Sequence, residues 1–152
     1  MYERTKVDLG SRSVGDEEFA GSFENCEYPN GMFKHADHIR LAWLYVGRFG
    51  RVGAEERITH SIRRFAASLG HEEKYHQTMT LAWLRLVHVA CCASPELTDF
   101  ETFIGSHLWL NDKKALNAFY SEELLLSERA RLSWVEPDRH PLPVTEASTR
   151  SA

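Results

Sequence analysis

The segment from residue 75 to residue 93 constrains the fold more than any other part of the chain. Read as a helix, it carries apolar side chains on almost every side, and Ser94-Pro95 ends it. A helix that is apolar all round is typical of the centre of a bundle. The sequence therefore predicts a central helix with these apolar residues: Met79, Leu81, Ala82, Trp83, Leu84, Leu86, Val87, Val89 and Ala90.

Helical spacing also marks the elements that would surround this central helix. Apolar residues recur every three to four positions over 33–48 and again over 54–69, and Thr98-x-x-Glu101 is a capping box for a fourth helix ending near Leu108. No segment shows the alternating pattern of a strand. The sequence thus predicts an all-α, single-domain helix bundle of about four main helices, occupying residues 31–135.

The two ends of the chain differ from this helical middle. Residues 1–30 are polar and rich in glycine, so we expect a flexible lead-in, docked to the body by Phe19 and Phe23. Residues 136–152 contain Pro137, Pro141 and Pro143, which predicts an extended or disordered tail.

Composition narrows the partners and the compartment. The chain has 152 residues, a formal net charge of −4 and no dense run of Lys or Arg, so neither nucleic acid nor a membrane surface is an expected partner. No apolar stretch is long enough to span a bilayer, and the start of the chain lacks the apolar run of a signal peptide. Three cysteines, an odd number, suggest reduced thiols. We therefore expect a cytoplasmic protein.

The first feature with chemical content is the pair His35 and His38. Residues three apart lie on one face of a helix, so two imidazoles here can bind one metal ion. His76, at the head of the central helix, is a third candidate ligand if the first and third helices are neighbours. Three imidazoles suit zinc, iron or copper, with an open position for water, oxygen or substrate.

Other side chains could complete such a site. Asp37 and Glu73 are candidate catalytic carboxylates, which could ligate the metal, orient a histidine or act as a base. A partly apolar substrate pocket would be lined by Tyr45, Thr78, Thr80 and Trp83.

Each of these residues also has a structural interpretation. Histidines on an apolar face often serve as hydrogen-bonded core residues, and we interpret His88 in that way; Cys91 and Cys92 would fill core volume. Arg40 and Arg85 interrupt apolar surroundings, where either could anchor an anionic substrate or extend its charged end to solvent.

Both histidine segments also resemble those of a known group. Phe33-x-His35-x-x-His38 and Tyr75-His76-x-Thr78, together with Trp134-Val135-Glu136-Pro137, are similar to a family of short bacterial helical proteins of uncharacterised function. The resemblance covers most of residues 33–143 and implies that the two histidine segments belong to one module. The family pattern usually has Glu after the second histidine; Gln77 stands there in this chain.

Two functions therefore stand as hypotheses. The first is a small metal-dependent oxygenase or hydrolase that acts on a small, partly apolar organic molecule, with iron, copper or zinc held by histidine. The alternative is a non-catalytic metal- or ligand-binding or regulatory helical protein. The composition leaves a homodimer open.

Overall fold

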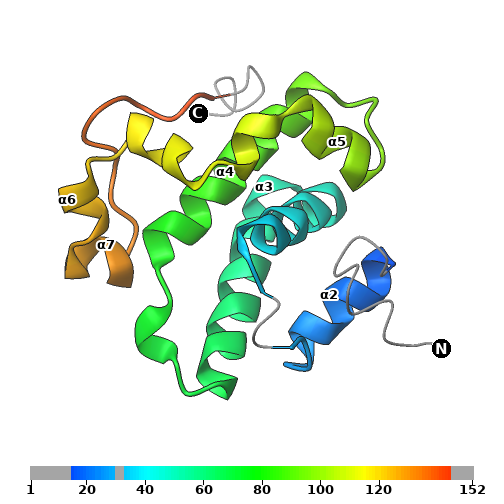
Figure 1. Ribbon diagram of the computed structural model, residues 1–152, viewed down its shortest axis with the longest axis horizontal. Helices are drawn as coiled ribbons and strands as arrows, with labels where there is room; N and C mark the ends of the chain where they lie inside the picture. The colour runs from blue at the N-terminus through cyan, green and yellow to red at the C-terminus, as the bar shows by residue number, and fades with distance from the viewer. Residues whose placement is uncertain (1–14, 30–32, 145–152) are drawn as a thin grey trace.

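The structure is a computed structural model, which describes residues 15–29 and 33–144. Two long helices form its centre, α3 (His35–Ser68) and α4 (Gln77–Ala93), which pack against each other (Figure 1). Helix α2 (Asp16–Glu24) packs on α3, and α7 (Glu128–Leu132) packs on α4. No strand occurs in the described ranges. The predicted all-α bundle is confirmed.

Helix α3 bends at Gly50, the residue that joins the two helices predicted over 33–48 and 54–69. Gly50 has φ 74° and ψ 176°, whereas the residues on either side are helical. This combination of angles is open almost only to glycine, because a Cβ would meet the backbone. The bend therefore depends on the residue type at position 50.

Replacing Gly50 with alanine should lower the free energy of unfolding by about 1–3 kcal/mol, since alanine must adopt this strained conformation. Gly47→Ala is the matched control. Gly47 is helical and an added Cβ meets nothing within 4 Å, so that variant should gain about 0.5–1 kcal/mol. Urea unfolding followed by circular dichroism measures both. Equal effects of the two substitutions would contradict the role assigned to Gly50.

Short helices complete the chain after α4. They are α5 (Phe100–Ser106), the 3-10 helices η4 (Leu108–Asn111) and η5 (Lys113–Ala118), α6 (Glu122–Leu125) and α7; a further 3-10 helix, η3 (Glu72–Lys74), precedes α4. Side chains of Asp99, Asp112, Ser121 and Ser127 cap four of them. The expected capping box at Thr98 was wrong, because Asp99 is the residue that accepts from the Thr102 amide.

Helix α2 corrects the expected lead-in. Within the predicted flexible segment, Asp16–Glu24 is a helix, and Phe19 and Phe23 are fully buried, as their predicted docking requires. The Phe23 ring contacts the rings of Tyr28, Phe33 and Phe65 at centroid distances of 4.6–4.9 Å, and that of Phe19 at 5.8 Å. These contacts fix α2 against the second half of α3 and against the residues that precede α3. The remainder of the predicted lead-in, residues 1–14 and 30, lies outside the described residues.

The segment after α7, residues 134–144, contains no helix or strand and is called the extended segment below. It is held by backbone groups: the Arg139 amide donates to the Phe119 carbonyl (2.9 Å), and the Tyr120 hydroxyl donates to the Val135 carbonyl (2.8 Å). Residues 134–144 thereby lie alongside α4 and form one wall of a cavity described below. The predicted tail over residues 145–152 lies outside the described residues.

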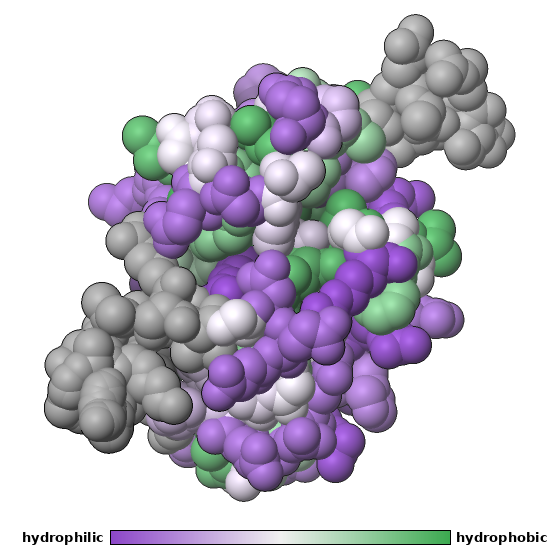
Figure 2. All heavy atoms as spheres, turned by 90° about the vertical axis from the view of Figure 1, so that its right-hand side faces the viewer, coloured by the Kyte–Doolittle hydropathy of each residue, from purple (hydrophilic) through white to green (hydrophobic). Residues whose placement is uncertain are grey.

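One face of the molecule is mainly polar. Figure 2 shows a face on which hydrophilic residues predominate and hydrophobic ones are visible only in small areas between them. Among the described residues, no helix has the length and hydrophobicity needed to cross a membrane.

Candidate functional site

His35 and His76, two of the three predicted metal ligands, each bind a backbone carbonyl. The Nε2 of His35 donates to Leu110 (2.8 Å), and its ring packs edge-on against Trp83. The Nε2 of His76 donates to Leu125 (2.7 Å), while its Nδ1 accepts from the Met79 amide (3.1 Å). One neutral tautomer satisfies both nitrogens of His76. Burial lowers the pKa of both histidines, which favours this neutral form.

These contacts show a structural role for His35 and His76. His35 ties the start of α3 to η4, and His76 ties the start of α4 to α6. Both ring nitrogens of His76 are occupied, so that side chain has no lone pair left for a metal in this conformation. The described residues include no group of three His, Cys, Asp or Glu side chains that could hold a metal ion. The geometry therefore does not support the predicted binding of one metal ion by His35, His38 and His76.

His38 is the exception among the three. Its Nε2 is buried and has no hydrogen-bond partner in the described part of the chain. Burial, with a smaller effect from His35, lowers the pKa of His38 to about 4. His38 is thus a neutral, incompletely satisfied residue beside the Phe33 ring, at 6.4 Å between centroids.

Asp37 and Glu73, the two predicted catalytic carboxylates, do not join the histidines in a group that could hold a metal ion in the described part of the chain. Asp37 is buried and accepts from the Lys34 amide (3.0 Å), which caps α3, and from the Tyr28 hydroxyl. Glu73 is exposed on η3 beside His71. Their contacts are those of a helix cap and a surface residue.

The four residues predicted to line a substrate pocket are all buried, and none lines the three cavities described below. The Tyr45 hydroxyl donates to Glu24 (2.7 Å) and contacts the Ser61 hydroxyl. Thr78 donates to the Ser133 carbonyl (2.8 Å) and accepts from the Val135 amide (3.1 Å), so it secures the segment after α7. Thr80 and Trp83 lie in the core.

A different site lies on the outer side of α4. One stripe of that helix lines three neighbouring cavities in turn, and its members are Gln77, Leu81, Arg85, His88 and Cys92. The arginine cavity, of about 540 Å³, lies between this stripe and the extended segment. Its walls are Arg51, Arg85, His88, Val89, Trp134 and residues 136–144.

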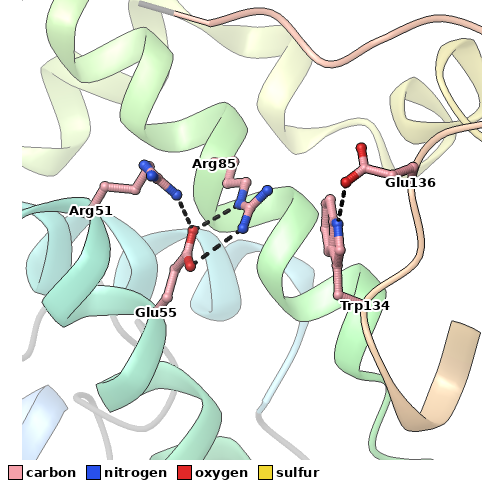
Figure 3. A network of polar contacts seen from close by, with 5 residues as sticks. All are labelled: Arg51, Glu55, Arg85, Trp134 and Glu136. Carbon is pink, nitrogen blue, oxygen red and sulfur yellow. Dashed lines mark hydrogen bonds and ion pairs between the residues drawn. The ribbon is translucent and has the colours of Figure 1, made fainter. Parts of the chain in front are cut away.

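A network of charges shapes the wall of the arginine cavity (Figure 3). Glu55 of α3 accepts from Arg51 Nη1 (2.6 Å) and from Arg85 Nε (2.7 Å), so one carboxylate orients two guanidinium groups. The Arg85 guanidinium also stacks on the Trp134 ring, 4.2 Å from its centroid. Arg85 is therefore fixed on two sides, by an ion pair and by a cation–π contact.

The carboxylates on the opposite wall are already engaged. Glu136 accepts from Trp134 Nε1 (2.9 Å), on the far side of the indole ring from Arg85 in Figure 3. Asp138 accepts from the amide and the hydroxyl of Ser121, both at 2.7 Å, which lowers its pKa. Thus neither acid is paired with the two arginines.

The other two cavities differ in their lining. The cavity of about 810 Å³ beside η3 is lined by three glutamates, three arginines and His60, and its apolar lining residues are Ala67, Tyr75, Leu81 and Leu132. The cysteine cavity, of about 570 Å³, lies between Gly47–Gly50 of α3 and the end of α4, and His88 lies on the walls of both this cavity and the arginine cavity. The arginine cavity is the one of these three on whose wall a single carboxylate orients two guanidinium groups.

Comparison with protein-family models, with curated proteins and with solved structures found no significant match. The resemblance to short bacterial helical proteins therefore stays a prediction.

Proposed function

We propose that the protein is a non-catalytic ligand-binding protein, and that its arginine cavity binds a small organic anion with an aromatic or otherwise apolar body. The observation that carries this proposal is the pair of arginines oriented by Glu55 on the cavity wall. The proposal follows the second of the two hypotheses drawn from the sequence and requires no metal.

The arrangement of the charges supports an anionic group on one wall of the cavity. Arg51 and Arg85 share the single negative charge of Glu55, so these three side chains together retain one positive charge. Arg139, Glu136 and Asp138 lie on the opposite wall, so the anionic group of a ligand would face Arg51 and Arg85. A guanidinium has five N–H donors, and neither arginine uses all of them on Glu55. The remaining donors can bind a carboxylate in the forked geometry that arginine favours.

The remaining walls support an apolar body. Beside the arginines the cavity is lined by Val89, Trp134, Leu142 and three prolines. Ligand sites typically have volumes of about 300–1,000 Å³ and a mainly apolar lining with a few convergent polar groups. At about 540 Å³ the arginine cavity lies within that range.

Calorimetric titration with 2-naphthoate tests the proposal, because this probe has an aromatic body and one carboxylate. At about −0.3 kcal/mol per heavy atom, a ligand of this size should bind with a dissociation constant of about 1 mM or tighter. Arg51→Gln should weaken binding about tenfold or more, since a hydrogen bond to a charged group contributes about 1.5–3 kcal/mol. Its effect on stability should be small, because Arg51 is partly exposed.

Two controls make the result specific. 2-Naphthamide has the same body without the charge and should bind more weakly than 2-naphthoate. Arg64→Gln makes the same charge change at an exposed position of α3 outside the arginine cavity, and should leave the affinity within about twofold of wild type. Equal losses in Arg51→Gln and Arg64→Gln would contradict a site in this cavity, as would the absence of any binding.

A further inference from the structure

We infer that Cys92 is a nucleophilic thiol with His88 as its proton acceptor, and that it adds to an α,β-unsaturated carbonyl compound whose apolar part occupies the cysteine cavity. This site differs from the proposed anion site and does not depend on it. The inference starts from the position of the thiol on the cavity wall, beside a base.

The geometry pairs the two side chains directly. Cys92 and His88 are four residues apart on α4, so they lie on the same face, and Cys92 Sγ lies 3.5 Å from His88 Nε2. Cys92 is exposed and both residues line the cysteine cavity. The sequence-based interpretation of Cys92 as a core-filling residue was therefore wrong.

His88 is suited to accept the thiol proton. Burial is the main cause that lowers its pKa, and Arg51 lowers it further while Glu55 raises it. The imidazole is therefore neutral at pH 7, and its Nε2 can accept from the thiol. A thiol with a neighbouring base is more nucleophilic than an isolated one, because the thiolate is the reacting species.

The other two cysteines lack this arrangement. Cys91 is adjacent in sequence but only partly exposed, and burial raises the pKa of its thiol to about 12. The Sγ of Cys26 lies 3.7 Å from the Arg64 carbonyl, to which it donates. They therefore serve as internal references for the reactivity of Cys92.

The cysteine cavity selects the class of electrophile. Its walls include the apolar side chains of Trp43, Leu44, Val46 and Leu97. Gly47 adds no side chain there, and a Cβ built on it meets nothing within 4 Å, so the space beside it is open. An aromatic or aliphatic group attached to the electrophile can occupy that space.

The reaction balances without a further reactant. His88 Nε2 takes the proton from Cys92, the sulfur forms a bond to the β-carbon of the carbonyl compound, and the carbon–carbon double bond becomes an enolate. The proton then passes from His88 to the α-carbon. The product is a thioether, with no leaving group and no change in net oxidation.

The test measures the rate at which each cysteine of the full-length protein is modified at pH 7, by mass spectrometry of peptides. The probes are acrylamide, which is small, and N-phenylmaleimide, which carries an apolar ring. We expect Cys92 to react first with both. His88→Gln keeps a polar side chain but removes the base. It should slow the modification of Cys92 about tenfold or more and leave the rate at Cys26 unchanged. Circular dichroism checks that the variant is folded.

A second variant tests the cavity. Gly47→Leu places a side chain in the open space. It should slow the reaction of N-phenylmaleimide with Cys92 at least severalfold, while acrylamide should modify Cys92 at the wild-type rate. Equal Cys92 rates in wild type and His88→Gln would overturn the role of His88. An unchanged N-phenylmaleimide rate in Gly47→Leu, or equal slowing of both probes, would overturn the assignment of the apolar part to this cavity.

Discussion

Phe23→Ala should lower the free energy of unfolding by about 3–5 kcal/mol, as expected for the truncation of a fully buried aromatic side chain. Phe23 is fully buried, and its ring is the one that contacts Tyr28, Phe33 and Phe65 together. Truncation would leave a cavity between α2 and α3 and remove the aromatic contacts. Urea unfolding at pH 7.5, followed by circular dichroism, gives the change directly.

Leu126→Ala is the control for this experiment. Leu126 is 78% exposed, so its truncation should change the free energy of unfolding by no more than about 0.5 kcal/mol. A loss below about 1 kcal/mol in Phe23→Ala would mean that α2 does not pack on α3 as described.

Acidification should destabilise the protein between pH 6.5 and pH 4, and His38 should account for much of the loss. Its pKa falls from 6.5 to about 4 on folding, so between these values the unfolded chain binds a proton that the folded protein does not. The stability that neutral His38 contributes is therefore fully present above pH 6.5 and decreases as the pH falls toward 4. The shift corresponds to about 3 kcal/mol at most, since the residue as a whole is only partly buried.

The variant His38→Leu separates this effect from general acid unfolding. Leucine cannot bind the proton in either state. Between pH 7.5 and pH 4.5 the free energy of unfolding of this variant should therefore decrease less than that of wild type, and the two decreases should differ by about 2–3 kcal/mol. His60→Leu replaces an exposed histidine of the same helix and should stay within about 0.5 kcal/mol of wild type at pH 7.5. An identical pH dependence in wild type and His38→Leu would contradict the burial of this imidazole.

The helices were predictable because their signals are local. The apolar character of residues 75–93 and the spacing of Ile39, Ala42 and Val46 require only neighbouring positions, and α3 and α4 follow from them. Helix α2 was missed, because its nine residues bury only Phe19, Ala20 and Phe23 and its stability comes from packing on α3.

The histidine site could not be judged from the sequence, because the partners that decide it are backbone carbonyls. Leu110 lies 75 residues from His35, and Leu125 lies 49 residues from His76. A carbonyl has no signature in the sequence, so the same two histidines fit a metal site and a pair of structural hydrogen bonds equally well. The three-dimensional contacts favour the second.

The arginine cavity was only partly visible from the sequence. Arg85 stood out as a charge among apolar residues and was considered as an anchor for an anion. Its partners Glu55 and Trp134 come from α3 and from the extended segment, and nothing local connects them with Arg85. The pairing depends on how three distant segments pack.

The central claim is that an organic anion binds beside Arg51, Arg85 and Trp134, and side-chain NMR during titration with 2-naphthoate tests it most directly. We expect saturable shifts of the Arg85 Nε–H and Trp134 Nε1–H resonances, since these residues line the arginine cavity, and little change at Trp109, which lies on η4 outside it. Shifts confined to residues outside the arginine cavity, or none at all, would contradict it.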